Sequence, residues 1–349
     1  SAGLAELRGT ETDHVTAEEL LKRADVAMYS AKRVRAGGVA TFTSDMRLVD
    51  ASDPVSGRLP VGLPGARMGG MRMLSQLRAA IADGRLSVEY QPKYQLATGR
   101  IVGVEALVRW AHPEWGKLLP DQFLPLARQN GLMGALTDLV LHRAADDAVG
   151  WHTLGFAVPF AINLSPPSLS ELSLATKIAG VMADRHLPFN HVTVEITEDL
   201  LLSNPSKVND VLNRLREFGI RVAMDDFGSG YSALNYLRQL PIDELKLDKA
   251  IIAPVAVEPR ASVIVRKVVE LARELGMACV AEGVENAATA EVLTRYGCDM
   301  AQGYHFSPAV VAEALPGMLA VQNPRIVERA SYNGRAPGGQ SVQADAPKG

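Results

Sequence analysis

From residue 221 the chain reads Arg221-Val222-Ala223-Met224-Asp225-Asp226-Phe227-Gly228-Ser229-Gly230. Its first five residues form a short, mostly apolar run that is typical of a strand buried in a parallel sheet. Two adjacent carboxylates therefore stand where this strand ends, and Gly228 and Gly230 allow backbone angles that are closed to other residues. Neighbouring carboxylates repel each other unless they share a cation or a proton. The stretch favours a metal site, although an aspartate-rich turn with Asx hydrogen bonds also explains it.

The composition is that of a soluble globular protein, with 349 residues of which 47% are hydrophobic and 21% are charged. A net charge of −3 and the lack of a Lys/Arg block give no support to binding of a long nucleic acid. No apolar run is long enough to span a membrane, and the start at Ser1 is unlike a signal peptide. We therefore expect a cytoplasmic chain without membrane contact, while an upstream region of the parent protein could carry a membrane tether.

Four segments follow one another along the chain. Residues 1–42 predict a short strand, a helix and a second short strand, with Thr16 and Glu19 forming a capping box at the helix start. Residues 43–70 are rich in Gly, Pro, Ser and Asp and predict a linker. Residues 71–320 have the length of one α/β barrel domain. Residues 321–349 predict a flexible, disordered tail.

Within residues 71–320, strand patterns alternate with helical patterns. The predicted strands are at 86–90, 101–108, 158–164, 191–196, 220–225, 244–247, 277–281 and 300–302. Helical stripes lie between most of them, for example Ile264, Val268, Leu271 and Leu275 before Gly276. This alternation predicts an α/β fold with a parallel sheet and right-handed crossovers. A TIM-like (β/α)8 barrel fits the strand count better than a doubly wound open sheet, since no Gly-rich dinucleotide fingerprint follows the first strand.

Polar residues interrupt seven of these apolar strands, in the strand or directly after it: Glu105, Asn163, Glu195, Asp225, Lys246, Glu282 and Gln302. A buried carboxylate or amide without a partner costs several kcal/mol, so residues of this kind are tolerable where they converge on cations and a polar ligand. In a barrel they converge at the carboxyl ends of the strands. Oxygen ligands of these types suit Mg²⁺ or Mn²⁺, whereas two cysteines and scattered histidines argue against zinc.

The same residues lie in segments that resemble a known family over residues 71–320, the EAL family of cyclic di-GMP phosphodiesterases. The matching segments are Tyr90-Gln91-Pro92-Lys93, Glu105-Ala106-Leu107-Val108-Arg109, Asn163-Leu164-Ser165, Glu195-Ile196-Thr197-Glu198, the 225–230 stretch, Leu245-Lys246-Leu247-Asp248, Ala281-Glu282-Gly283-Val284-Glu285 and Ala301-Gln302-Gly303-Tyr304. Residues 1–42 resemble the C-terminal end of a GGDEF, or diguanylate cyclase, domain through the run at 24–33. The signature turn of that second family is absent from the sequence, so no cyclase activity is expected.

The resemblance implies a metal-dependent hydrolysis of cyclic di-GMP to linear pGpG, which lowers a bacterial second messenger. It implies two divalent cations, Mg²⁺ or Mn²⁺, held by Glu105, Asn163, Glu195, Asp225, Asp226 and Glu282. Catalytic roles are implied for Lys246, Glu282, Asp225 and Asp226. Substrate contacts are implied for Gln91, Leu107, Arg109, Asp248 and Gln302. Glu198 and Glu285 would support the loop after Asp226, and a homodimer is implied through residues 225–240, with Tyr231, Leu234, Tyr236 and Leu237 near the twofold interface.

Several alternatives remain open at this level. Either Glu282 or Lys246 could remove the proton from the attacking water. Glu285 could instead be the acidic residue favoured at a helix start by the macrodipole. A receptor that binds cyclic di-GMP without cleaving it is the alternative function, and a purely structural barrel is a third, which the polar strand ends argue against.

Overall fold

The computed structural model describes residues 2–4, 39–41, 66–165, 168–171, 173–197, 205–228 and 237–322 of the chain. The chain divides into two compact units, Ser1–Leu59 and Pro60–Gly349. In the first unit, β1 (Ala2–Leu4) pairs in parallel with β2 (Val39–Thr41). These are two short strands at the ends of the segment where two were predicted; the helix predicted between them lies outside the described residues.

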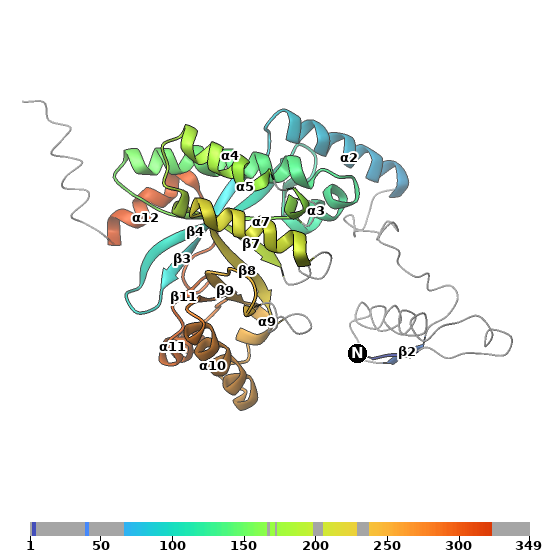
Figure 1. Cartoon of the computed structure of the whole chain (residues 1–349). Coiled ribbons are helices and arrows are strands. Elements are labelled where there is room, and N and C mark those ends of the chain that lie inside the picture. The colour runs from blue at the N-terminus through green and yellow to red at the C-terminus, as the bar shows by residue number, and fades with distance from the viewer. Residues whose placement is uncertain are drawn as a thin grey trace, which may run out of the picture. The chain divides into compact units, whose positions relative to one another are not determined.

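The second unit is built on a closed barrel of eight strands (Figure 1). In chain order they are β3 (Ser87–Gln95), β4 (Arg100–His112), β6 (Phe160–Asn163), β7 (Val192–Thr197), β8 (Arg221–Phe227), β9 (Glu244–Leu247), β10 (Ala278–Ala281) and β11 (Met300–Ala301). The barrel closes because β3 pairs with both β4 and β11. All eight coincide with predicted strands, and the barrel prediction is confirmed.

The direction of the first strand differs from the prediction of a parallel sheet. β3 runs antiparallel to both β4 and β11, whereas the pairs from β4 through β11 are parallel. The reason is the length of the connection: four residues separate Gln95 from Arg100, enough for a hairpin turn but too few for a crossover helix.

Helices cover the outside of the barrel. They are α2 (Ala66–Ala82), α3 (Pro120–Gln129), α4 (Met133–Thr153), α5 (Leu174–Asp184), α7 (Pro205–Phe218), α9 (Lys249–Ile252), α10 (Pro259–Glu274), α11 (Ala287–Tyr296) and α12 (Leu315–Gln322). Figure 1 shows α4, α5 and α7 along one side, and α10 and α11 along another. Two short strands complete the sheet, β5 (Gly116–Leu118) beside β4 and β12 (Val310–Val311) beside β3. Among the described residues, no helix is long and apolar enough to cross a membrane.

Two predicted boundaries move slightly. The linker was predicted to reach residue 70, but α2 begins at Ala66. The tail was predicted from residue 321, but α12 continues to Gln322, and the following residues lie outside the described part. The fully buried residues of α10 are Val265, Val269 and Ala272. Of the predicted stripe, Val268 and Leu271 are half-buried and pack against the core, whereas Ile264 is 55% exposed and Leu275 is 44% exposed. Both sets have helical spacing, so packing against β10 decides between them.

Along the barrel strands, apolar side chains that face outward alternate with polar side chains that face the barrel interior. In β7, β8 and β9 the fully buried aliphatic residues Val194, Val222 and Leu245 belong to the hydrophobic core beneath the helices. Their sequence neighbours Glu195 and Lys246 are equally buried but bond to polar groups from other strands inside the barrel. Successive side chains on a strand point to opposite faces, so this pattern places the charged residues together in the barrel interior.

Candidate active site

Carboxylates from four strands surround one lysine at the carboxyl end of the barrel. Lys246 of β9 is completely buried, and its Nζ lies 2.7 Å from Glu282 Oε1, 2.8 Å from Glu195 Oε2, 3.0 Å from Asp225 Oδ1 and 3.4 Å from Glu105 Oε2. Glu105 belongs to β4, Glu195 to β7 and Asp225 to β8, while Glu282 directly follows β10. We call these five residues the Lys246 cluster.

Two amide side chains join the Lys246 cluster from the remaining strand ends. Asn163, the last residue of β6, donates from Nδ2 to Glu105 Oε1 over 2.8 Å. Gln302, directly after β11, donates from Nε2 to Glu105 Oε2 over 2.7 Å and to Glu282 Oε1 over 2.9 Å. These contacts fix the orientation of the amide, so that Gln302 Oε1 is the remaining acceptor; it is buried and has no hydrogen-bond partner among the described residues. All seven polar residues predicted at the strand ends therefore meet.

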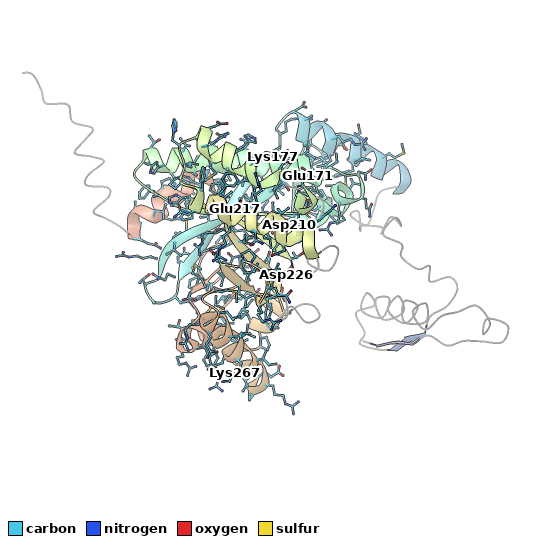
Figure 2. All side chains as sticks on the ribbon, viewed as in Figure 1. Glu171, Lys177, Asp210, Glu217, Asp226 and Lys267 are labelled. Atoms are coloured by element: carbon cyan, nitrogen blue, oxygen red, sulfur yellow. The ribbon has the colours of Figure 1, made fainter. Side chains whose placement is uncertain are left out.

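A β-bulge aims Asp225 and Asp226 at the same side. Adjacent residues on a regular strand point to opposite faces, but the register of β8 against β9 shifts between Met224 and Phe227. Asp226 has a φ of 56°, in the left-handed region, which aspartate tolerates better than most residues. As a result, Asp225, Asp226 and Glu282 each place a carboxylate oxygen within 4.8 Å of the others. Figure 2 shows Asp226 at the end of β8, near α9.

The next residues explain why the loop needs glycine. Gly228 has a φ of 99°, and a Cβ there would lie 2.9 Å from Ile251 Cδ1. Any other residue would combine a strained backbone with a steric overlap. Gly230, singled out with it in the sequence, lies outside the described residues.

The charges in the Lys246 cluster shift one another's pKa values. Burial raises the pKa of Glu195 to about 7, with a further increase from Glu105, and burial raises the pKa of Glu282 to about 8. Burial also raises the pKa of Asp226, together with repulsion from Asp225. Burial acts in the same direction on Glu105, but Lys246 and Lys93 outweigh it and lower the pKa of Glu105 to about 2. Burial opposes the charge of Lys246, yet the surrounding carboxylates raise its pKa well above 10.5.

This distribution of charge fits a site for cations. The Lys246 cluster and Asp226 together contribute five carboxylates, against the two ammonium groups of Lys246 and Lys93. The raised pKa values of Glu195, Glu282 and Asp226 reflect that excess of negative charge in a buried space. Carboxylate and amide oxygens are also the ligand types that Mg²⁺ and Mn²⁺ prefer, and the buried Gln302 Oε1 offers one more acceptor.

The predicted substrate contacts lie around the Lys246 cluster in different settings. Arg109 of β4 is buried and donates from Nε to Glu89 Oε2 over 2.9 Å. Gln91 of β3 is also buried and donates from Nε2 to the backbone oxygen of Ser307 over 2.7 Å. Asp248 caps the N-terminus of α9, and Leu107 is half-buried.

The predicted loop supports and dimer residues are described in part. Glu285 is exposed and forms an ion pair with Lys249 of α9, while Asn286 is the residue that caps α11. Leu237 is 5% exposed and packs in the hydrophobic core of this chain, so its side chain is not available to a second copy. Glu198, Tyr231, Leu234 and Tyr236 lie outside the described residues.

The sequence analysis assigned no role to Lys93 and Glu244, two charged residues deeper in the barrel. Lys93 of β3 lies 3.0 Å from Glu195 Oε1 and 3.3 Å from Glu244 Oε2, and both of its partners are buried. The parity of the strand could have indicated Glu244, since it stands two residues before Lys246 and must share its face.

Comparison with known proteins gives consistent results. A family model described as EAL domain matches residues 74–309. A Caulobacter vibrioides protein described as an uncharacterized signaling protein is 36% identical over 324 residues, which cover 93% of this chain and 38% of that protein. The protein named cyclic di-GMP phosphodiesterase NbdA from Pseudomonas aeruginosa is 36% identical over 303 residues, covering 86% of this chain and 36% of that protein.

A solved structure titled "PaMucR Phosphodiesterase, c-di-GMP complex" has a TM-score of 0.67 and 37% sequence identity. The match covers 70% of this chain and 99% of that one. The chain spans 38%, 34% and 48% of the length of the first three curated relatives that it matches.

Proposed function

The chain belongs to the EAL domain family, and from this we propose that it hydrolyses cyclic di-GMP to linear pGpG with the help of divalent cations. The observation that carries the proposal is the Lys246 cluster, in which carboxylates from four strands converge at the end of the barrel where such folds build their sites. In the reaction, water adds to one phosphorus and one bond from phosphorus to a 3′ oxygen breaks. The proton of the water leaves to a base, and the 3′ oxygen receives a proton as it departs.

The cation ligands in this proposal are the residues at the strand ends. Glu105, Asn163, Glu195 and Asp225 would hold a first ion, and Asp225, Asp226 and Glu282 would hold a second directly or through water, each ion being Mg²⁺ or Mn²⁺. Such ions neutralise the phosphate and lower the pKa of a bound water. The bulge in β8 supports the shared role of Asp225, because it brings Asp225 and Asp226 to the same side.

Glu282 is the better base of the two that the sequence left open. Lys246 directs its ammonium group toward four carboxylates, and their charge keeps it protonated, so it has no lone pair to accept a proton. The side chain of Glu282 is 18% exposed, against 0% for Lys246, and a carboxylate oxygen can accept a proton from a water at the site. Lys246 then orients the carboxylates and the attacking water.

Substrate binding falls to the residues around the Lys246 cluster. The guanidinium of Arg109 donates from Nε to Glu89 and from Nη1 to the backbone oxygen of Val108, and these two bonds fix its orientation. The remaining N–H groups on Nη1 and Nη2 are suited to binding a phosphate through two hydrogen bonds. Gln91, Leu107, Asp248 and Gln302 supply further contacts. A homodimer through residues 225–240, with Glu198 and Glu285 supporting the loop, belongs to the same proposal; light scattering that finds monomers with full activity would contradict it.

One incubation tests the function. The purified chain is mixed with cyclic di-GMP and Mg²⁺ or Mn²⁺, and the nucleotides are separated by chromatography over time. Appearance of pGpG, abolished by EDTA, is the expected result. Binding without turnover would instead select the non-catalytic receptor, and the absence of both would contradict the two functions together.

A further inference from the structure

A line of alternating charges runs through the barrel interior below the Lys246 cluster. Arg221 Nη2 lies 3.2 Å from Glu244 Oε1, and Glu244 Oε2 lies 3.3 Å from Lys93 Nζ. Lys93 Nζ lies 3.0 Å from Glu195 Oε1, and Glu195 Oε2 lies 2.8 Å from Lys246 Nζ. The side chains from Glu244 to Lys246 are at most 5% exposed, so this line lies in the interior of the barrel.

The two oxygens of Glu195 therefore have different partners. Oε1 accepts a hydrogen bond from Lys93, whereas Oε2 accepts one from Lys246 at the centre of the cluster. From these contacts we propose that Lys93 is a positioning residue: it occupies Oε1 of Glu195, so that Oε2 alone is presented to the site. The inference rests on the proposed function, in which Glu195 is a cation ligand.

Stability alone does not account for Lys93. Replacing a buried ion pair by apolar side chains of similar volume is often neutral or stabilising, so an interior filled by aliphatic residues would serve a structural role at least as well. Residues that hold a ligand in its orientation, in contrast, have to be polar.

Two variants separate positioning from a structural role. Lys93→Met removes the donor to Glu195. The same change leaves Glu244 buried without its lysine partner, so the single variant can destabilise the fold. The double variant Lys93→Met with Glu244→Leu removes both charges of that pair and is expected to fold with a thermal midpoint near that of the parent. Lys267→Met on the exposed surface of α10 is the matched control.

The readouts are Mn²⁺ affinity, followed by electron paramagnetic resonance without substrate, and the kinetics of cyclic di-GMP hydrolysis. The folded double variant is expected to bind Mn²⁺ about 10- to 100-fold more weakly, the usual effect of removing a residue that orients a metal ligand. At saturating Mn²⁺ its kcat should fall while KM for cyclic di-GMP changes little, because Lys93 does not touch the substrate.

Each result decides something. A folded double variant with the Mn²⁺ affinity and kcat of the parent would show that the pair is structural and would overturn the inference. A parent chain that binds no Mn²⁺ would overturn it together with the cation ligands. A parent that binds Mn²⁺ but forms no pGpG would contradict the proposed function, while the difference in Mn²⁺ affinity between parent and variant would still decide the role of Lys93.

Discussion

Lys246→Met tests how the structure compensates the charges of its central carboxylates. Methionine has a similar volume but no charge, so the change leaves Glu105, Glu195, Asp225 and Glu282 without the ammonium that lies 2.7–3.4 Å from each of them. Removing one member of a buried ion pair costs about 3–5 kcal/mol, because the remaining charge stays buried without its partner. For a domain of this size, that corresponds to a drop of roughly 6–20 °C in the thermal midpoint.

The assay is thermal unfolding followed by circular dichroism at neutral pH in EDTA. Lys267→Met is the matched control, since its exposed ion pair with Glu270 contributes little to stability, and Figure 2 shows Lys267 on the outer helix α10. Adding Mg²⁺ or Mn²⁺ should raise the midpoint of Lys246→Met more than that of the parent, because the cations bind carboxylates that have lost their lysine. A Lys246→Met midpoint equal to that of Lys267→Met would refute the reasoning.

Three further predictions concern activity, pH and the N-terminal segment. Glu105→Gln should keep the fold but lower the rate of cyclic di-GMP hydrolysis by at least about 10²-fold, the scale for one preorganised electrostatic group, and an unchanged rate in Mg²⁺ would contradict the cation site. In EDTA, the free energy of unfolding should decrease as pH rises from 4.5 toward about 8, because the raised pKa of Glu282 means that the folded state keeps a proton that the unfolded chain releases; urea titrations of Glu282→Gln should show a flatter profile. Incubation of the chain with GTP should yield no cyclic di-GMP, since residues 1–42 lack the signature turn of a cyclase, and any product detected would disprove this.

Most of the site was predictable because each of its polar residues stands out in its own strand. Asn163, Glu195 and Lys246 each interrupt an apolar run, and that contrast is visible without knowing which strands are neighbours. A closed barrel then brings the strand ends together, so the convergence follows from the fold alone.

Other features depend on contacts that no local pattern carries. Adjacent acids at 225 and 226 suggest a shared site, but only the bulge and the positive φ of Asp226 show how both reach it. The burial of Lys93 depends on Glu195 and Glu244, which come from strands more than a hundred residues later in the chain. The alternation of apolar and polar residues in β3 does not show whether the strand runs parallel or antiparallel to its neighbours. The short connection to β4 was the feature that indicated antiparallel pairing.

The reversal of β3 also determines where the chain enters the barrel. In a barrel with eight parallel strands, the first strand starts at the end opposite the active site. Here Ser87, the first residue of β3, pairs with Arg109 near the carboxyl end of β4, so the strand starts at the end that carries the Lys246 cluster. The helix before it contacts the same end, since Arg72 forms an ion pair with Glu114 and Gln76 Oε1 lies 3.1 Å from His112 Nε2. The chain therefore enters the barrel from the rim that carries the Lys246 cluster, where α2 contacts the end of β4 close to Arg109, rather than from the far end of the barrel.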